Sequence, residues 1–267
     1  MVNSFMQNNV LVRSLVALVI LPIVGLALYL GDAYFMGFLI VLGFVGAKEW
    51  LRLTDPEAPS HLVIQFYLTL FSMLIFMMTG LVTWGIVFSL AMLILYYARV
   101  KLLKRPNPIM MSFGLVYLFV PIASGLWLRN HAPEGLLHFM LLVLILIATD
   151  TGAFFTGRAI GGPKLAPAIS PNKTWSGSIG GLLSALLVCY LFQAYVPSYS
   201  MPISFWAVAI LVSMMGQIGD LFESHMKRRA GVKDSGTLLP GHGGILDRVD
   251  SYLFGIPMMA LLVYVSI

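Results

Sequence analysis

Cysteine and charge are what this chain of 267 residues has least of. Its single cysteine, Cys189, excludes an intrachain disulfide and a cysteine-based metal cluster. Charged residues make up only 10% of the chain, whereas 59% of the residues are hydrophobic. Soluble globular domains carry about 25% charged residues, so this composition excludes that class. It indicates instead a protein that crosses a membrane several times.

Long apolar runs predict an all-α, polytopic integral membrane protein with about nine transmembrane helices. A hydrocarbon core about 30 Å thick requires roughly 20 residues of helix. The first run lacks the small-residue cleavage site of a signal peptide, so we expect it to be a span. No internal repeat or extramembrane domain is evident, and we expect residues 1–267 to form a single transmembrane domain. The predicted spans are residues 11–30, 34–51, 61–79, 82–98, 112–129, 136–155, 176–196, 202–221 and 250–267.

The basic residues predict how the chain is oriented, because Lys and Arg collect in cytoplasmic loops. If the basic linkers lie in the cytoplasm, 15 of the 16 bases share one side and only Arg129 lies outside. The N-terminus is then cytoplasmic and, with an odd number of spans, the C-terminus is outside. We therefore assign the net charge of +5 to membrane orientation and expect no nucleic-acid partner. The cluster at 99–105 could also hold anionic lipid head groups.

A first polar segment follows the sixth predicted span and reads ATDTGAFFTGRAIGGPKLAPAISPNKTWSGS. Asp150 ends an apolar run, where an unpaired carboxylate is unfavourable and needs a cation. Arg158 could supply it as a structural ion pair, and the alternative is a substrate or metal role for Asp150. Ser170 or Thr174 could cap the next helix, whose N-terminus together with Lys173 would suit a phosphate group.

A second polar segment, Gly219 to Ser251, holds five of the eleven acids and five of the sixteen bases. Asp220 ends the eighth predicted span. Asp247 and Asp250 begin the ninth one turn apart, so these two share a helix face. The glycines of the GHGG sequence between them allow backbone N–H groups to approach an anion. Positive charge comes from Lys227, Arg228, Arg229 and Lys233.

Carboxylates at two helix ends around a basic, glycine-containing loop suit a nucleoside triphosphate with Mg²⁺. Mg²⁺ binds one or two carboxylates together with phosphate oxygens, and basic side chains neutralise the remaining phosphate charge. The alternative is a set of interlocking salt bridges at the membrane surface. His242 either contacts a phosphate or forms a hydrogen bond within its loop.

Residues 224–250 carry many fixed positions of a known signature. They are Ser224-x-Met226-Lys227-Arg228, then Lys233-Asp234-x-Gly236, then Leu239-Pro240-x-His242-Gly243-Gly244-Ile245-Leu246-Asp247-Arg248-Val249-Asp250. This pattern resembles the signature of the phosphatidate cytidylyltransferases, also called CDP-diacylglycerol synthases. Asp150, Arg158 and the SPNKTW sequence also resemble the preceding cytoplasmic loop of that family. Ser176 departs from the pattern, because the family often carries an acid there.

The resemblance implies an enzyme of phospholipid biosynthesis that converts CTP and phosphatidic acid into CDP-diacylglycerol and pyrophosphate. It implies a metal centre in which Asp220 and Asp247 bind Mg²⁺, with K⁺ as a second ion. It also implies a homodimer in the bacterial inner membrane, in contact with membrane lipids. We expect the active site at the cytoplasmic face.

We assign site roles on this basis. Catalytic roles go to Asp220, Asp247, Lys227 and Asp250, and Asp150 is a further candidate metal ligand. Asp234 and Asp250 either complete the metal shell or orient the basic side chains. The predicted substrate-binding residues are Arg158, Ser170, Lys173, Thr174, Ser224, Arg228, Lys233, Asp234, His242, Gly243, Gly244 and Arg248.

Two other functions remain open. A transporter would carry ionisable residues near the bilayer midplane on broken helices, whereas here they cluster at predicted helix ends. A polyprenol kinase sharing parts of this fold would transfer the γ-phosphate of CTP instead of the cytidylyl group. A CDP-alcohol phosphatidyltransferase is disfavoured, because the sequence contains no DG-x₂-AR…G-x₃-D-x₃-D run.

Overall fold

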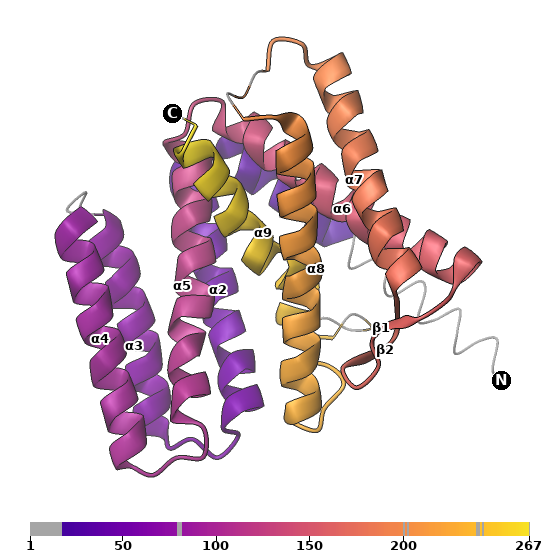
Figure 1. Cartoon of the computed structure of the whole chain (residues 1–267). Helices are drawn as coiled ribbons and strands as arrows, with labels where there is room; N and C mark the ends of the chain where they lie inside the picture. The colour runs from indigo at the N-terminus through magenta and orange to yellow at the C-terminus, as the bar shows by residue number, and fades with distance from the viewer. Residues whose placement is uncertain are drawn as a thin grey trace. The chain divides into compact units, whose positions relative to one another are not determined.

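The computed structural model describes residues 18–78, 82–199, 201, 203–238, 241 and 243–266. Its regular structure is almost entirely helical, with one small β-hairpin (Figure 1). The elements are the helix Leu18–Leu30, α2 (Asp32–Thr54), α3 (Ser60–Met78), α4 (Val82–Leu102), α5 (Pro108–Asn130), α6 (Gly135–Ile160), β1 (Lys164–Ala166), β2 (Ser170–Thr174), α7 (Trp175–Tyr195), α8 (Phe205–Arg229) and α9 (Leu246–Tyr264).

Seven of the described helices, α2 to α8, are long and apolar enough to cross a membrane. The first and ninth predicted spans are not among them. The described part of the first is the short apolar helix Leu18–Leu30, and the rest of that span lies outside the described residues. The ninth, α9, begins with three charges close together, on Asp247, Arg248 and Asp250. The prediction of an all-α integral membrane protein is confirmed, and the count of nine spans stays a prediction.

Two helices run well past the ends that hydropathy predicts for them. The eighth span was expected to end at residue 221, but α8 continues to Arg229, so Asp220 lies inside a helix and not at its end. Likewise α6 continues past residue 155 to Ile160. Hydropathy marks where apolar residues stop, whereas a helix continues as long as its backbone hydrogen bonds do.

The chain divides into two compact units, which we describe separately. Unit 1 comprises Met1–Ala27, Ala33–Ala123 and Ala230–Arg248, and unit 2 comprises Leu28–Asp32, Ser124–Arg229 and Val249–Ile267. The division describes compactness only, so the expectation of a single functional domain stays a prediction.

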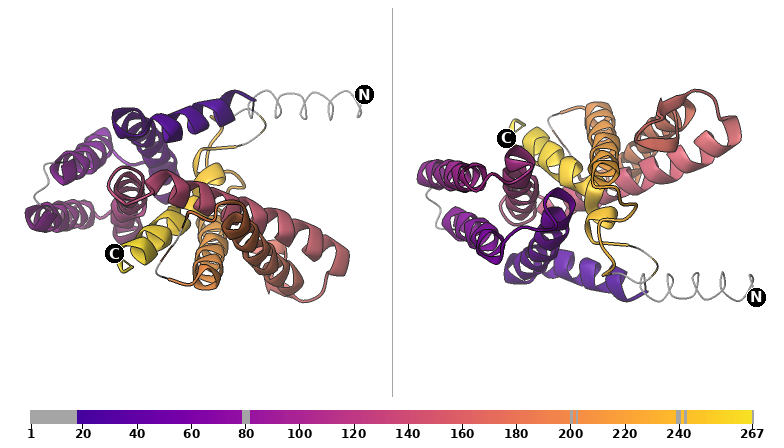
Figure 2. Two further views of the ribbon diagram at one scale, coloured as in Figure 1. Left: turned by 90° about the horizontal axis from the view of Figure 1, so that it is seen from above. Right: turned by 90° about the horizontal axis from the view of Figure 1, so that it is seen from below.

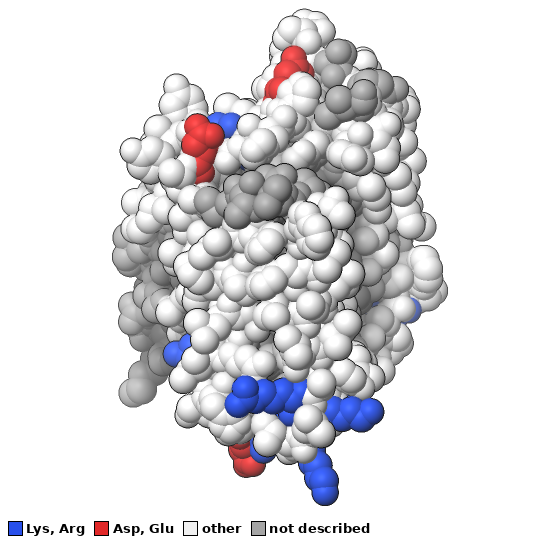
Figure 3. Space-filling view, turned by 90° about the vertical axis from the view of Figure 1, so that its left-hand side faces the viewer, with Lys and Arg blue, Asp and Glu red and all other residues white. Residues whose placement is uncertain are grey.

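In unit 1, α3 and α4 lie side by side in all three ribbon views (Figures 1 and 2). Large apolar side chains on α4 are exposed, among them Trp84, Leu90 and Ile94. A continuous apolar face of this kind suits lipid contact, because monomeric soluble proteins rarely expose such a surface to water. Figure 3 shows Lys and Arg gathered at its lower edge, the edge at which α4 ends, and Arg99 and Lys101 lie in the last turn of α4.

Two polar contacts join other parts of unit 1. The Trp50 side chain of α2 donates a hydrogen bond from Nε1 to the carbonyl oxygen of Met110, at 3.0 Å. Below the helices, Arg105 donates to both carboxylate oxygens of Asp55, each at 2.7 Å. This hydrogen bonding to Asp55 raises the pKa of Arg105 above its usual value. The link after α2 is thereby tied to the link after α4.

In unit 2, glycines allow α6 and α7 to pack very closely (Figure 1). A Cβ on Gly180 would lie 2.0 Å from Thr156 Oγ1, and one on Gly181 would lie 2.7 Å from the carbonyl oxygen of Thr149. Small residues at a helix interface let two backbones approach, which is a common way for helices to associate in membranes. We call this contact the α6–α7 seam.

The hairpin fills the link between these two helices, where the sequence predicted only a loop. Strands β1 and β2 pair antiparallel, with Ala166 opposite Ser170. Gly161 and Gly162 reverse the chain with φ values of 65° and 101°, which favour glycine. Thr174 caps α7, because its Oγ1 accepts a hydrogen bond from the N–H of Gly177 at 3.1 Å. The predicted cap at Thr174 is confirmed, and the alternative cap at Ser170 is wrong, since Ser170 lies in β2.

Candidate active site

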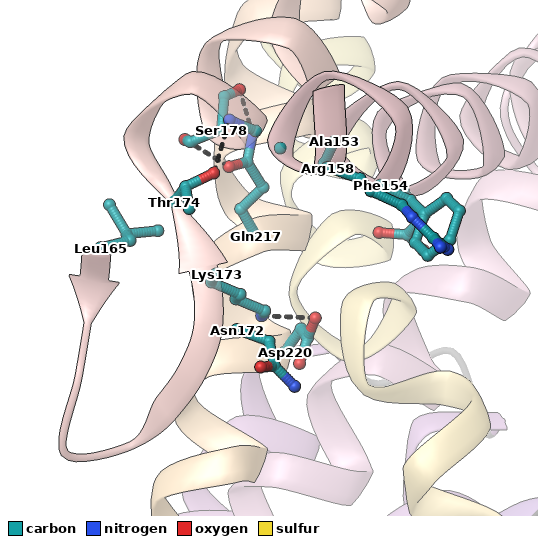
Figure 4. Close-up of a pocket in the computed structure, with 13 residues that line it drawn as sticks. Ala153, Phe154, Arg158, Leu165, Asn172, Lys173, Thr174, Ser178, Gln217 and Asp220 are labelled. Carbon is teal, nitrogen blue, oxygen red and sulfur yellow. Dashed lines mark hydrogen bonds and ion pairs between the residues drawn. The ribbon is translucent and has the colours of Figure 1, made fainter. Parts of the chain in front are cut away.

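A cavity of about 660 Å³ opens in unit 2 among α6, α7, α8 and the hairpin. Figure 4 shows that polar side chains from all of these elements reach into it. Five of the lining residues were predicted as site residues from the sequence, and they come from segments up to 70 positions apart. The lining residues are Asp150, Ala153, Phe154, Gly157, Arg158, Leu165, Asn172, Lys173, Thr174, Gly177, Ser178, Gln217 and Asp220.

The strongest polar contact in the cavity joins the hairpin to α8. Lys173 extends from β2 and its Nζ lies 2.5 Å from Asp220 Oδ2 (Figure 4). Both side chains keep about a third of their surface exposed, 28% for Lys173 and 32% for Asp220. Asp220 also accepts a hydrogen bond from the Ser224 hydroxyl at 3.3 Å. A lysine held this way can exchange its carboxylate partner for a phosphate that enters the cavity.

Asp150 and Arg158 both line the cavity from α6, but they do not form the structural pair that was one of the two alternatives. The helix is unbroken between them, so eight residues place them about 12 Å apart along its axis. Among the described residues, the structure contains no ion pair between them. Asp150 and Arg158 are thus separately available to a bound molecule.

Three carboxylates of unit 2 share one electrostatic environment: Asp150, Asp220 and Asp250 repel one another. Lys173 and Lys227 partly offset this repulsion. The helices α8 and α9 approach closely here, since a Cβ on Gly219 would lie 2.4 Å from the carbonyl oxygen of Asp250. Carboxylates that repel one another favour a bound cation.

Lys227 lies in the last turn of α8, where it forms an ion pair with Glu223, an acid that sequence reasoning did not single out. The Glu223 side chain is buried, with 1% of its surface exposed, and that of Lys227 keeps 12%. Next to it, Arg228 is exposed. The predicted catalytic Lys227 is therefore a fixed charge, while Arg228 can reach solvent or a substrate.

Asp247 belongs to unit 1, and there its Oδ2 accepts several hydrogen bonds. The donors are the Ser235 N–H at 2.8 Å, the Ser235 hydroxyl at 3.0 Å and the Gly244 N–H at 2.8 Å. Gly243 has a φ of 84°, and a Cβ there would lie 2.7 Å from Asp247 Oδ2. The glycines thus accommodate a carboxylate of the protein itself, and their predicted role toward a substrate anion stays a prediction.

Other predicted residues of the signature are exposed in unit 1, namely Lys233, Asp234 and Arg248. His242 lies outside the described residues, so both interpretations of it remain open.

Sequence reasoning missed several polar residues around these sites. Gln217 and Ser178 line the cavity and bond to each other, with the Ser178 hydroxyl 2.5 Å from Gln217 Oε1. In unit 1, Glu49 accepts hydrogen bonds from Ser235, Ile245 and Leu246, which lie next to Asp247 in the sequence or contact it. A lone acid near the end of the apolar run 34–51 was the only signal for Glu49. Its partners are too distant in sequence for any pattern to reveal.

The residues present fit a hard divalent cation in their chemistry, because carboxylate oxygens are the ligands that Mg²⁺ prefers. Mg²⁺ needs only one or two of them beside phosphate oxygens and water. Within the described ranges, no three acidic, histidine or cysteine side chains gather as a ready-made metal cluster. Any Mg²⁺ held by described residues would therefore take the rest of its ligands from a substrate and water.

Comparisons with known proteins agree with the motif. A family model described as "Cytidylyltransferase family" matches residues 11–266 of the chain. A protein of Brucella suis biovar 1 (strain 1330), named phosphatidate cytidylyltransferase, is 38% identical over 264 residues, which cover 93% of this chain and 94% of that protein. A Brucella melitensis protein of the same name matches to the same extent. A Staphylococcus epidermidis protein of that name is 50% identical over 129 residues, or 48% of this chain and 50% of its own.

Proposed function

The chain belongs to the cytidylyltransferase family, and on that premise we propose that it transfers the cytidylyl group of CTP to phosphatidic acid. The products are CDP-diacylglycerol and pyrophosphate, and the enzyme is a phosphatidate cytidylyltransferase of phospholipid biosynthesis. Two relatives with that name share 38% identity over nearly the full length of both chains, which supports this pair of substrates. The apolar helices suit an enzyme whose lipid substrate stays in the bilayer.

In the reaction, a phosphate oxygen of phosphatidic acid attacks the α-phosphorus of CTP. A new P–O bond forms while the bond from the α-phosphorus to the bridging oxygen breaks, and pyrophosphate leaves with that electron pair. The attacking phosphate is already an anion, so no strong general base is needed. Positioning and charge neutralisation by the protein lower most of the barrier.

The cavity with the Lys173–Asp220 ion pair is the observation that carries this proposal. Lys173 binds a phosphate of CTP once the nucleotide enters, and Arg158 binds another from α6. Lys227, Arg228, Lys233 and Arg248 neutralise further phosphate charge. The remaining substrate contacts come from Ser170, Thr174, Ser224, Asp234, His242, Gly243 and Gly244.

Mg²⁺ would shield the triphosphate charge and favour the departure of pyrophosphate. Asp220 and Asp247 are its proposed ligands, with Asp150 as a further candidate and K⁺ as a second ion. Asp250 completes the metal shell or orients the bases. The mutual repulsion of the unit 2 carboxylates supports a cation there, since a cation relieves it.

We place the enzyme in the inner membrane of a bacterium, as a homodimer with its N-terminus and active site at the cytoplasmic face and its C-terminus outside. The distribution of Lys and Arg supports this orientation. The acyl chains of phosphatidic acid remain among lipids and enter sideways between helices.

Incubation of detergent-solubilised protein with phosphatidic acid and α-labelled CTP tests the function. We expect the label to appear in a lipid that migrates as CDP-diacylglycerol on a thin-layer plate. Transfer of a γ-label to lipid would instead identify a lipid kinase. Ion flux into proteoliposomes without nucleotide, together with no labelled lipid, would identify a transporter.

A further inference from the structure

Glu49 is an acid buried in a membrane helix, and the reaction described above gives it no task. It lies in α2 with 5% of its surface exposed. Its carboxylate accepts hydrogen bonds from the Ser235 hydroxyl, the Ile245 N–H and the Leu246 N–H, each at 2.9 Å. These donors lie 186 to 197 positions further along the chain. A buried carboxylate satisfied in this way is a strong anchor.

Two of the donors stand at the very start of α9. Leu246 is its first residue and Ile245 precedes it. Their N–H groups have no partner within the helix, because the first turn of a helix leaves its N–H groups free. The Glu49 carboxylate therefore acts as the cap of α9, and its negative charge suits the positive end of the helix dipole.

The third donor links Glu49 to Asp247. The Ser235 hydroxyl lies 2.9 Å from Glu49 Oε2 and 3.0 Å from Asp247 Oδ2. A hydroxyl has one hydrogen, so the two carboxylates share it. Displacement of one carboxylate consequently alters the hydrogen bonding of the other.

Gly236 and Gly244 bring the backbone close to the Glu49 carboxylate. A Cβ on Gly236 would lie 2.5 Å from Glu49 Oε1, and one on Gly244 would lie 2.4 Å from Glu49 Oε2. Only glycine allows the backbone to come this close at both positions.

We propose that Glu49 is a positioning residue for Asp247: it fixes Ser235 and the start of α9, and through Ser235 it orients the Asp247 carboxylate. The contacts above support the anchoring of Ser235 and α9 by Glu49. The expected effect of Glu49 on kcat rests on the proposed function, in which Asp247 serves the transfer of the cytidylyl group.

The test compares Glu49→Gln with Glu57→Gln, a matched change at an exposed glutamate just after α2. Both Glu49 oxygens accept hydrogen bonds, so the amide nitrogen of Gln must face a donor and the anchor fails. Lys233 is exposed beside the anchored Ser235, which makes trypsin cleavage after Lys233 a direct probe of the loop.

We expect cleavage after Lys233 to be about 10-fold faster in Glu49→Gln than in wild type or Glu57→Gln. We expect kcat to fall about 10–100-fold, as for other residues that orient a ligand, while KM for CTP changes much less. Glu49→Asp keeps the charge and recovers part of kcat. Ser235→Ala removes the shared hydroxyl and changes cleavage and kcat in the same direction, which carries the test if Glu49→Gln does not fold.

The outcomes separate the two proposals. If wild type makes CDP-diacylglycerol and Glu49→Gln matches it in cleavage and kcat, the positioning role is overturned and the function stands. If wild type transfers no cytidylyl group but Glu49→Gln exposes Lys233 to trypsin, the function fails and the anchor stands. A fall in melting temperature with kcat per folded enzyme unchanged would mean that Glu49 only stabilises the fold.

Discussion

In unit 1 the carboxylates of Glu49 and Asp247 each accept several hydrogen bonds, from N–H groups and a hydroxyl. In unit 2, Asp220 and Asp250 also accept a hydrogen bond, from Ser224 and Ser251, but there Asp150, Asp220 and Asp250 repel one another. The reason lies in the backbone. Asp247 and two of the donors of Glu49, Ile245 and Leu246, stand where a loop enters a helix, and N–H groups are free there. Asp150 and Asp220 lie inside helices, whose N–H groups already bond within the helix. Glu49 and Asp247 therefore stabilise the local structure, whereas Asp150 and Asp220 are available to cations.

Removal of divalent metal should have the largest effect, because it removes the charge that the unit 2 carboxylates favour. We expect a chelator to abolish cytidylyl transfer and Mg²⁺ to restore it. Mg²⁺ should also raise the melting temperature of the wild-type protein, by mass action on the folded state. Cytidylyl transfer at full rate in the presence of chelator would mean that the unit 2 carboxylates do not need a divalent cation, so they would not differ in this respect from those of unit 1.

Asp220→Asn should lower kcat by about 10²–10³-fold, since it removes a charge proposed to act on the triphosphate. The melting temperature should change little, because relief of the repulsion with Asp150 and Asp250 offsets the loss of the partly exposed ion pair with Lys173. Kinetics and a thermal melt on the same preparation check both parts. Asp32→Asn, at an exposed acid of the same unit, is the control and should change neither.

Lys173→Ala should lower kcat/KM for CTP by about 10–100-fold, the range expected for one charged contact. Lys173→Arg should keep part of the activity, because it keeps the charge but changes the geometry. Steady-state kinetics with varied CTP measure the effect. Lys164→Ala, on the neighbouring strand, serves as the control, and equal losses in both variants would contradict a specific role for Lys173.

Asp247→Asn should destabilise the protein by about 1–3 kcal/mol, because a neutral amide oxygen accepts the hydrogen bonds of Ser235 and Gly244 more weakly than a charged carboxylate does. Asp220→Asn should show no such loss, which makes this pair of variants the sharpest comparison between the units. Chemical or thermal unfolding in detergent measures it. Equal stability of Asp247→Asn and wild type would mean that those hydrogen bonds contribute little.

Hydropathy was sufficient to predict the helices of the fold, since an apolar run long enough to span a bilayer leaves few alternatives. It did not predict that α8 would carry Asp220 far inside the helix, because helices extend through polar sequence such as that up to Arg229. It also gave no sign of the β1–β2 hairpin, which forms from short, mostly polar segments closed by Gly161 and Gly162.

For the candidate site, residue types and spacing were sufficient to select Asp150, Lys173 and Asp220, which the structure brings to one cavity. The role of Glu49 could not be predicted. Its donors lie nearly 200 positions away, and only the folded chain brings Ser235 and the start of α9 to it. The local sequence pattern identifies candidate catalytic and binding residues, whereas long-range packing decides which other residues position them.

The α6–α7 seam has one more consequence. Thr174 ends the strand that carries Lys173, and it caps the first turn of α7. The position of Lys173 therefore depends on how α6 and α7 pack. A side chain larger than hydrogen at Gly180 would push the helices apart, because Thr156 already occupies that space. Such a change would tilt the β1–β2 hairpin and move the Lys173 ammonium group away from the phosphate that it is proposed to bind, so a steric change in the α6–α7 seam would weaken the proposed binding of CTP.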